Sequence, residues 1–278
     1  MFSIIIPTWN NLDMVKLCVQ SIRKNSAYPH EIVLHINDGN DGTRAWATAE
    51  GLIFTASPQN IGICRAVNLA FDKTTKDLVM YMNDDMYVLP DWDTALVEEI
   101  NLLGDQEFML SATMIEPKSE SKNVIVADYG RDVATFEEVQ LLEDYNHYSF
   151  SNWSGASWPP LIVRRTAWLE IGGFSLEFSP GMYSDPDFSM KMWRLGCRVF
   201  MGVGRSRIYH FQSRSTERVV KNNGRLQFMQ KWGISSNNFY KHYIRMGQPF
   251  KAVLAEPDES VVNRARWAVR FKLFFKPK

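Results

Sequence analysis

The chain has 278 residues and a mass of 32.1 kDa, which suits one α/β domain with an elaborated second half. Hydrophobic residues make up 45% of it and aromatic residues 13%, so the chain can bury a large core and is not a disordered protein. The 31 basic and 31 acidic side chains balance to a net charge of +0, which argues against a nucleic-acid partner, because such proteins need a net or clustered positive field.

Strand and helix patterns alternate through the first hundred residues. Apolar runs predict strands at residues 3–7, 31–36, 52–55 and 78–82. Helical periodicity predicts helices at residues 11–25 and 62–73. Nearly continuous apolar strands that alternate with helices are typical of a parallel sheet covered on both faces. Ligands bind at the carboxyl ends of strands in such sheets, and polar clusters follow three of these strands, at residues 8–10, 37–38 and 83–85.

The pattern of the second half is more mixed. Strands are predicted at residues 108–115 and 161–163, and a helix at 184–195. A helical extension is expected beyond Trp232. The three cysteines lie far apart without CxxC spacing, so we expect reduced thiols in a cytoplasmic protein rather than a disulfide scaffold or a cysteine zinc site.

Residues 264–278 form a basic, aromatic end. Six basic side chains and no acidic one are interleaved there with Trp267, Phe271, Phe274 and other apolar residues. Such a segment suits an anionic membrane surface, since rings settle at the headgroup level and cations meet anionic lipids. A helix docked on the body with a solvated basic face, or a contact in a homodimer, explains the same pattern. No apolar run approaches the ~20 residues that a spanning helix needs.

The segment Asn83-Asp84-Asp85 carries the first chemical signal. Two adjacent carboxylates directly after a buried strand are costly unless something positive binds them. A divalent cation that bridges to a diphosphate would do so, because hard cations choose carboxylate and phosphate oxygens. The alternative is a surface turn that leads into the next helix, near Asp91.

Several short motifs then occur in an order that resembles a known family. In chain order they are Ile4-Ile5-Ile6-Pro7-Thr8-Trp9-Asn10, Asn37-Asp38-Gly39, Asn60-Ile61-Gly62, Asn83-Asp84-Asp85, Ile171-Gly172-Gly173-Phe174, Ser184-Asp185-Pro186-Asp187-Phe188 and Tyr209-His210-Phe211 followed by Ser215. Together they closely resemble family 2 glycosyltransferases with the GT-A fold. The likeness covers roughly residues 3 to 233 without a break, so chance is a poor explanation although each motif is weak.

The resemblance implies the architecture. We expect an α/β, Rossmann-like GT-A fold with a mostly parallel central sheet flanked by helices. Residues 1–235 would form this domain, with a nucleotide-sugar half at 1–100 and a mixed, acceptor-binding half at 101–235. Residues 236–278 would be a helical C-terminal extension.

The resemblance also implies a donor site in the first half. Pro7, Thr8 and Asn10 would line the base pocket. Asp38 would accept a hydrogen bond from the base ring N–H, which favours uracil or thymine over cytosine. The remaining expected contacts to the nucleotide sugar are Asn60, Gly62, Asn83 and Asp84.

Metal and catalytic roles follow from the same resemblance. Asp85 and His210 would hold Mn²⁺ or Mg²⁺, although a buried structural histidine is the alternative for His210. Asp185 would be the general base, with Asp187 as a helper or as the alternative base. Trp153 and Trp158 lie in a Ser- and Gly-rich segment and would either line the acceptor cleft or pack in the core.

Two positions depart from the family pattern. An amide, Asn83, stands where the metal motif usually starts with an acid, so we expect a lower metal affinity. Ser184 replaces the glutamate that usually precedes Asp185. Less charge crowding there would lower the pKa of Asp185 and weaken it as a base.

These observations predict a metal-dependent inverting glycosyltransferase with Asp185 as its base. It would move a hexose or deoxyhexose from a UDP- or dTDP-sugar to a hydroxyl of a glycan or lipid-linked acceptor in polysaccharide or lipopolysaccharide biosynthesis. We expect it in the cytoplasm, either soluble or peripheral to the inner face of the plasma membrane. The alternatives are a non-catalytic scaffold of the same fold and a sugar nucleotidyltransferase; the latter needs a Gly-rich basic loop after the first strand, which this chain lacks.

Overall fold

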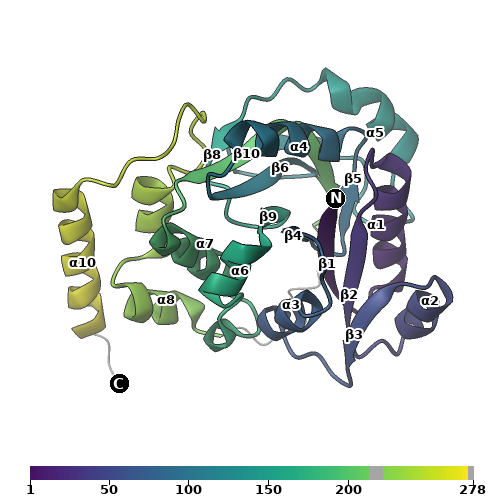
Figure 1. The fold of residues 1–278 in the computed structure, drawn as a ribbon, viewed down its shortest axis with the longest axis horizontal. Helices are drawn as coiled ribbons and strands as arrows, with labels where there is room; N and C mark the ends of the chain where they lie inside the picture. Colours follow the sequence, from purple (N-terminus) through teal and green to yellow (C-terminus); the bar gives the residue numbers. More distant parts are fainter. Residues whose placement is uncertain (213–221, 275–278) are drawn as a thin grey trace.

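The computed structural model describes residues 1–212 and 222–274 of the chain. It shows one ten-stranded sheet with helices on both faces (Figure 1). The motif residue Ser215 and the last four residues of the basic end, 275–278, lie outside the described part. Among the described residues, no helix has both the length and the apolar character that crossing a membrane requires.

The strands run in the order β3-β2-β1-β4-β9-β6-β10-β5, with β7 beside β6 and β8 beside β10. Their bounds are β1 Phe2–Trp9, β2 Glu31–Asn37, β3 Ile53–Ser57, β4 Leu78–Tyr81, β5 Met86–Val88, β6 Phe108–Glu116, β7 Val124–Val126, β8 Trp153–Ser154, β9 Leu161–Arg164 and β10 Val199–His210. All pairs from β3 to β4 are parallel, as are β6 with β10 and with β7. β9 runs antiparallel between β4 and β6, so both halves of the chain share one sheet.

The helices occupy the connections and the C-terminal part. Their bounds are α1 Leu12–Asn25, α2 Thr43–Ala49, α3 Ile63–Phe71, α4 Trp92–Leu103, α5 Glu138–Asp144, α6 Arg165–Ile171, α7 Ser184–Leu195, α8 Gly224–Trp232, α9 Ser236–Asn238 and α10 Glu259–Phe274, with short helical turns η1 Tyr145–His147, η2 Leu176–Phe178 and η4 Phe239–Tyr243. The expected mostly parallel α/β sheet is confirmed, and every predicted strand and helix has a counterpart with nearly the same bounds. The long strand β10 was not predicted.

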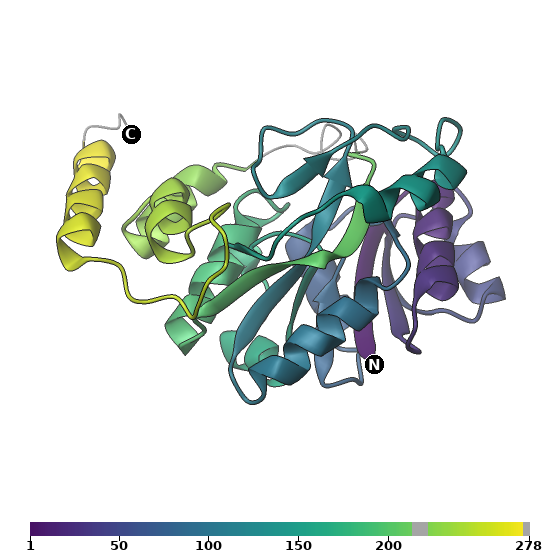
Figure 2. The same ribbon diagram turned by 90° about the horizontal axis from the view of Figure 1, so that it is seen from above.

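Burial on both faces explains the apolar strands. In β1, Ile4 and Ile6 pack into one core with residues of α1 and α4, whereas Ile5 packs into a second core with residues of α3, α6 and α7. Alternate side chains of a strand point to opposite faces, so a strand covered on both sides must be apolar throughout. Figure 2 shows the sheet from above, between α1 at one end and the C-terminal helices at the other.

The parallel register brings the polar strand ends together. Trp9 of β1 pairs with Asn37 of β2, and Ile5 of β1 pairs with Tyr81 of β4, so residues 8–10, 37–38 and 83–85 lie along one edge of the sheet. Tyr209 of β10 pairs with Ile115 of β6, which places His210 beside Glu116. The predicted meeting of the polar clusters is therefore confirmed.

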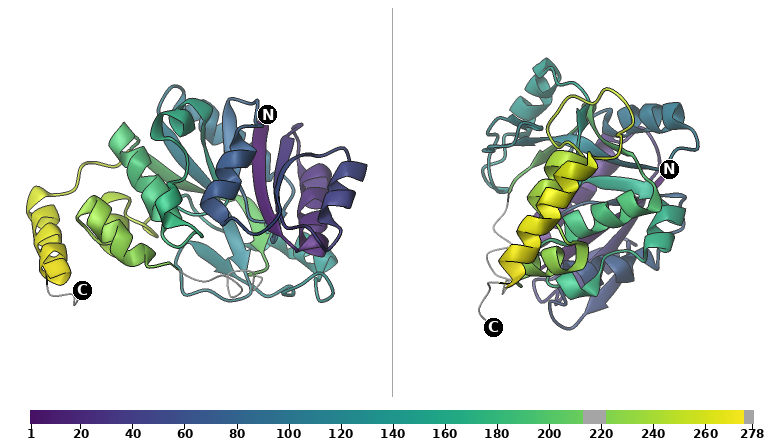
Figure 3. Two further views of the ribbon diagram at one scale, coloured as in Figure 1. Left: turned by 90° about the horizontal axis from the view of Figure 1, so that it is seen from below. Right: turned by 90° about the vertical axis from the view of Figure 1, so that its left-hand side faces the viewer.

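The helix α10 lies beside α8 at the far end of the molecule (Figures 1 and 3). Val262 and Val269 are buried, and Ala265 packs against the second core. The opposite side of the helix exposes Trp267, Phe271 and Phe274. The described part of the basic end is thus a docked helix that also presents an aromatic face.

Candidate active site

A histidine lies between two carboxylates at the carboxyl ends of the parallel strands. His210, at the end of β10, has its Nδ1 atom 2.7 Å from Oε1 of Glu116, at the end of β6. Its Nε2 atom is 3.4 Å from Oδ1 of Asp85, which follows β4. All three side chains are largely buried. The arrangement fixes the orientation of the imidazole toward Asp85.

The charge state of His210 follows from these neighbours. Burial by itself favours the neutral ring, but the charges and hydrogen bonds of Asp85 and Glu116 outweigh it and raise the pKa of His210 to about 10. Without another cation present, the imidazolium therefore neutralises part of the carboxylate charge. Within residues 1–212 and 222–274, no group of three or more His, Cys, Asp or Glu side chains is arranged as a metal-ligand set.

The ends of β1 and β2 are connected through Asn10. Its Nδ2 atom donates a 3.0 Å hydrogen bond to Oδ2 of Asp38, and its Oδ1 atom accepts from the backbone N–H groups of Gly39 and Asn40. Asp38 is partly exposed and has a φ of 64°, a left-handed conformation that aspartate tolerates better than most residues. Asn10 therefore sets the direction of the Asp38 carboxylate.

Thr8 and Asn37 complete this strand edge. The hydroxyl of Thr8 is buried and has no hydrogen-bond partner in the structure. A buried hydroxyl without a partner costs about 1–3 kcal/mol, which a ligand that pairs with it would recover. Pro7 is buried beside it in β1. The amide oxygen of Asn37 accepts from the backbone N–H of Ile61 and so ties β2 to the start of α3.

Two residues expected at the nucleotide have partners within the protein. The side chain of Asn60 accepts a 2.9 Å hydrogen bond from the backbone N–H of Gly62. Gly62 has a φ of 78°, and a Cβ there would lie 2.7 Å from Cα of Pro180. The absent side chain of Gly62 therefore serves a close approach to the loop before α7, whereas the sequence suggested only an approach to the nucleotide.

Asp185 lies in the first turn of α7, within electrostatic reach of Tyr81 and Tyr240. It is partly exposed, yet burial raises its pKa to about 7. Its charge is felt by Tyr81 of β4, by Cys64 of α3 and by Tyr240 of η4, each of which has its pKa raised mainly by burial and further by Asp185. The predicted lowering of the Asp185 pKa is wrong, because that prediction counted neighbouring charge alone and desolvation dominates.

Asp187 has quite different surroundings, although it is only two residues away. Its side chain is 0% exposed. One carboxylate oxygen lies 2.8 Å from Nζ of Lys231 and also accepts from the indole of Trp232, and the other accepts from the hydroxyl of Ser175. These partners make Asp187 an anchor between α7 and α8, and they disfavour its expected role as helper or alternative base.

Tyr81 connects the two ends of the site. Its hydroxyl donates a 3.1 Å hydrogen bond to the amide oxygen of Asn83. Its pKa is raised well above normal by burial, and further by the charges of Asp185, Asp84 and Asp85. The charges of the α7 carboxylate and of the Asp84–Asp85 pair both act on this one buried phenol, so these groups lie near one another around Tyr81.

The first half of the chain resembles a known protein family. Residues 3–127 match the family described as glycosyl transferase family 2. This stretch, which is under half of the chain, is similar to family 2 glycosyltransferases. A relative named O-antigen biosynthesis protein RfbC, from Myxococcus xanthus, is 23% identical over 228 residues, which are 77% of this chain but 17% of that protein.

Solved structures confirm the GT-A fold. The TarS 1–349 structure from S. aureus matches with a TM-score of 0.57 and 16% identity over 75% of this chain and 60% of that chain. The structure of GalNAc-T7 with UDP, GalNAc and Mn²⁺ matches with a TM-score of 0.60 and 15% identity over 99% of this chain and 55% of that chain. The mannosyltransferase PcManGT from Pyrobaculum calidifontis, solved with GDP-Man and Mn²⁺, matches with a TM-score of 0.53 and 16% identity over 77% of this chain and 57% of that chain. The chain therefore spans less than two thirds of each of these proteins.

Trp153 and Trp158, the two tryptophans considered for an acceptor cleft, lie in different surroundings. Trp153 is 4% exposed, its indole donates to the hydroxyl of Thr113, and a Cβ on Gly202 would lie 1.8 Å from its ring. Of the two places that the sequence left open for Trp153, the structure shows the core, so Trp153 does not line an acceptor cleft. Trp158 is half-buried and packs edge-on against Tyr240, with ring centroids 6.2 Å apart, so it stays near Asp185.

Sequence reasoning missed three residues of the site. Glu116 is a polar residue at the carboxyl end of an apolar strand, so the rule that found residues 83–85 would also have found it. Tyr81 and Tyr240 carry no such signal. Their positions beside Asp185 depend on contacts between segments far apart in the chain.

Proposed function

We propose that this protein is a metal-dependent inverting glycosyltransferase that uses a nucleotide-sugar donor. The observation that supports this most is the convergence of Asp38, the Asp84–Asp85 pair, His210 and Asp185 at one edge of the sheet of a chain whose first half is similar to family 2 glycosyltransferases. Glycosyl transfer needs a base pocket, a site for a diphosphate and its cation, and a general base. The cleft offers a candidate for each.

The base pocket is proposed at the ends of β1 and β2. Asp38, held by Asn10, would accept the ring N–H of uracil or thymine, and the unpaired hydroxyl of Thr8 would donate to a carbonyl of the base. Guanine also carries a ring N–H, and PcManGT was solved with GDP-Man, so GDP is the alternative nucleotide. The UDP- or dTDP-sugar stays the preferred donor.

The residues present suit a divalent cation that shares its ligands with a diphosphate. Asp85 supplies carboxylate oxygens and His210 an imidazole nitrogen, and Glu116 orients the ring from its other side. Mn²⁺ or Mg²⁺ held there would compensate the charge that develops on the leaving diphosphate. A bound metal competes with the proton on His210 for Nε2. Asp84 and Asn83 would meet the ribose and the diphosphate.

Asp185 is proposed as the general base. A hydroxyl of the acceptor attacks the anomeric carbon, its proton passes to a carboxylate oxygen of Asp185, and the bond between the anomeric carbon and the diphosphate oxygen breaks with its electron pair on the diphosphate. A base with a pKa of about 7 is well matched to this step near neutral pH. The second carboxylate of α7, Asp187, is paired with Lys231, which favours single displacement with inversion.

The acceptor is proposed to be a growing surface glycan, free or linked to lipid. The support is the relative named for O-antigen biosynthesis, of which this chain covers a small part, together with the exposed aromatic face of α10. That face and its arginines suit an anionic membrane surface at which a lipid-linked acceptor would be met.

Nucleotide binding measured by calorimetry tests the proposal. UDP, dTDP, GDP and CDP would each be titrated with Mn²⁺ and with a chelator. We expect UDP or dTDP to bind, at least about tenfold more tightly with metal. Asp85→Asn should remove the metal effect, and Asp38→Asn should weaken binding of the base in either condition. A preference for GDP would change the donor but keep the transferase.

The scaffold alternative has a distinct outcome. If a folded preparation binds no nucleotide, the site is not a donor site and the non-catalytic scaffold replaces the transferase. Nucleotidyltransferase activity would instead be detected as release of pyrophosphate from a nucleoside triphosphate and a sugar phosphate.

A further inference from the structure

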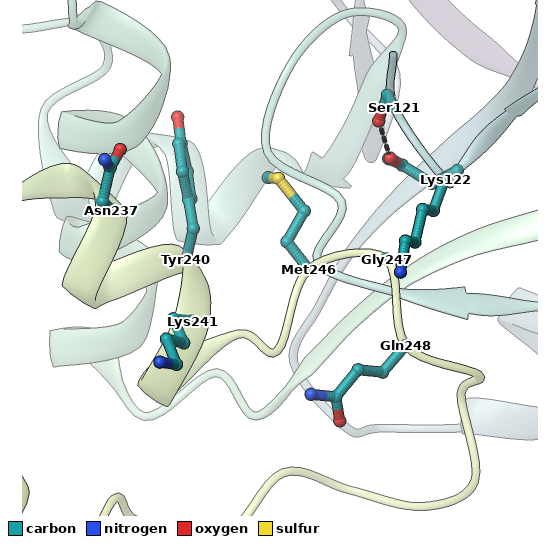
Figure 4. Close-up of a pocket in the computed structure, with 9 residues that line it drawn as sticks. Ser121, Lys122, Asn237, Tyr240, Lys241, Met246, Gly247 and Gln248 are labelled. Atoms are coloured by element: carbon teal, nitrogen blue, oxygen red, sulfur yellow. Dashed lines mark hydrogen bonds between the residues drawn. The ribbon is translucent and has the colours of Figure 1, made fainter.

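A second hollow lies between the C-terminal helices and the loop that follows β6. Its volume is ≈ 370 Å³, in the range of small-ligand pockets. The loop side contributes Ser121, Lys122 and Asn123, and the C-terminal side contributes Tyr240, Lys241 and neighbouring residues (Figure 4). In Figure 4 the ring of Tyr240 stands on one side, Lys122 on the other, and Met246 between them.

Each side of this pocket leads to one of the proposed catalytic groups. The loop begins directly after Glu116, which holds His210. On the other side, Tyr240 lies within the electrostatic reach of Asp185 and packs against Trp158. A molecule in the pocket would therefore contact Tyr240, which lies within electrostatic reach of the proposed base.

The polar groups that line the pocket are cations and amides. Two lysines, Lys122 and Lys241, line the pocket together with the side-chain amides of Asn123, Asn237 and Gln248, and no carboxylate is among its described lining residues. Amides and one aromatic face suit sugar hydroxyls and C–H groups, and two cations without a carboxylate beside them suit an anionic substituent.

One lining side chain has unmet hydrogen-bonding capacity. Asn123 is 1% exposed, and its Nδ2 atom has no hydrogen-bond partner. Its Oδ1 atom accepts from the hydroxyl of Ser121. Turning the amide over would exchange the two atoms and still leave one unpaired. A ligand hydroxyl that paired with this amide would relieve the cost of leaving it unsatisfied.

We propose that this pocket binds the acceptor glycan of the transferase and that it selects a sugar residue bearing a carboxylate or a phosphate. That the bound glycan is the acceptor rests on the proposed function. That the pocket binds an acidic sugar depends on the pocket alone. Lys122 and Lys241 would pair with the anionic group, and Tyr240 would hold the sugar near Asp185.

Ligand-observed NMR titration with three simple probes tests the pocket. The probes are methyl glucuronide, glucose 6-phosphate and methyl glucoside, added to the full-length protein at low salt. We expect one or both acidic probes to bind about fivefold to tenfold more tightly than methyl glucoside, as two exposed ion pairs allow. The two acidic probes distinguish a carboxylate from a phosphate.

Charge variants locate the effect. The double variant Lys122→Gln, Lys241→Gln should lose the preference for acidic probes, whereas the matched control Lys73→Gln, Lys76→Gln, on an exposed turn before β4, should keep it. Equal affinity for all three probes, or equal loss in both double variants, would overturn the proposal.

UDP binding with Mn²⁺ in the same variants separates the two hypotheses. Both double variants should bind UDP like the unmodified protein. If acidic sugars bind but no nucleotide does, the pocket stands as a glycan site and the transferase proposal fails. If UDP binds but the acidic preference is absent, the transferase stands and this inference fails.

Discussion

Asp185 and Asp187 show how two carboxylates of one helical turn acquire different properties. Asp187 has a lysine, an indole and a hydroxyl as partners, and these compensate its burial. For Asp185 desolvation is the cause of a pKa raised to about 7. Partners offset the desolvation cost of a buried charge, whereas a charge that is buried without such compensation is kept at a cost and suits proton transfer.

The pKa of Asp185 predicts the pH dependence of the reaction. A base works only when deprotonated, so kcat/KM should fall about tenfold per pH unit below about pH 7 and level off above it. Asp185→Asn should lower kcat by about 10²-fold or more and leave UDP affinity unchanged. The measurement is a pH profile of initial rates with both proteins. A normal rate in the variant would remove Asp185 from the role of base.

Asp185→Asn, which should lower kcat, should also make the protein more stable at neutral and higher pH. Folding raises the pKa of the Asp185 carboxyl from the ordinary aspartate value of 3.8 to about 7, so the native protein loses stability as the pH rises from about 4 to about 7. At pH 8, Asp185→Asn should therefore increase the free energy of unfolding by about 2–4 kcal/mol. Denaturant unfolding at pH 8 and at pH 4 checks this, and the two proteins should differ little at pH 4.

At the scale of elements, the start of α3 packs directly against the loop before α7. The backbone N–H of Ile63 donates a 2.7 Å hydrogen bond to the carbonyl of Pro180. No room exists for a side chain at Gly62, because Pro180 packs directly against its Cα. This contact joins the donor half to the helix that carries Asp185, so the spacing between the donor site and the proposed base depends on it.

Gly62→Ala should destabilise the protein and weaken catalysis together. Both the positive φ and the clash with Pro180 would cost free energy, in total about 2–4 kcal/mol. Gly51→Ala is a matched control, because Gly51 has a φ of 64° but no atom within 4 Å of its would-be Cβ, and it should cost only about 1–2 kcal/mol. Thermal unfolding and kcat would be measured for both. Equal losses in the two variants would mean that the Pro180 contact contributes nothing.

At the scale of the whole molecule, α10 has features that suit both docking on the body and binding to a membrane surface. One face, with Val262 and Val269, is buried on the body. The other exposes Trp267 by 69%, Phe271 by 67% and Phe274 by 81%. At 3.6 residues per turn these three side chains project nearly opposite the buried face, and Arg264 and Arg270 flank them. Docking on the body and binding to a membrane are therefore compatible.

The aromatic face predicts binding to anionic vesicles. The triple variant Trp267→Ser, Phe271→Ser, Phe274→Ser should reduce co-flotation with phosphatidylglycerol-containing vesicles by about tenfold or more and leave the melting temperature within about 2 °C. The matched control Leu102→Ser, Val139→Ser, Leu169→Ser, three exposed apolar residues elsewhere, should still bind. Binding should also weaken at high salt. If the aromatic variant instead converts a dimer to a monomer in light scattering without changing flotation, the face is a homodimer contact.

The sequence by itself determined the main strands and helices of the first hundred residues and the edge of the sheet at which the candidate site lies. A strand covered on both faces must be apolar along its length, and a polar residue directly after it must lie at the sheet edge, so both signals are local. For this reason the clusters at residues 8–10, 37–38 and 83–85 could be placed without a structure.

Only the tertiary structure decided what each side chain at that edge can do. Lys231 and Trp232 make Asp187 an anchor, Gly202 receives Trp153 into the core, and Glu116 turns His210 toward Asp85. Each of these contacts joins residues that lie far apart in the chain. These contacts decide how deeply a side chain is buried and what it pairs with, and burial and pairing in turn decide its pKa and reactivity. Local sequence patterns do not encode such contacts.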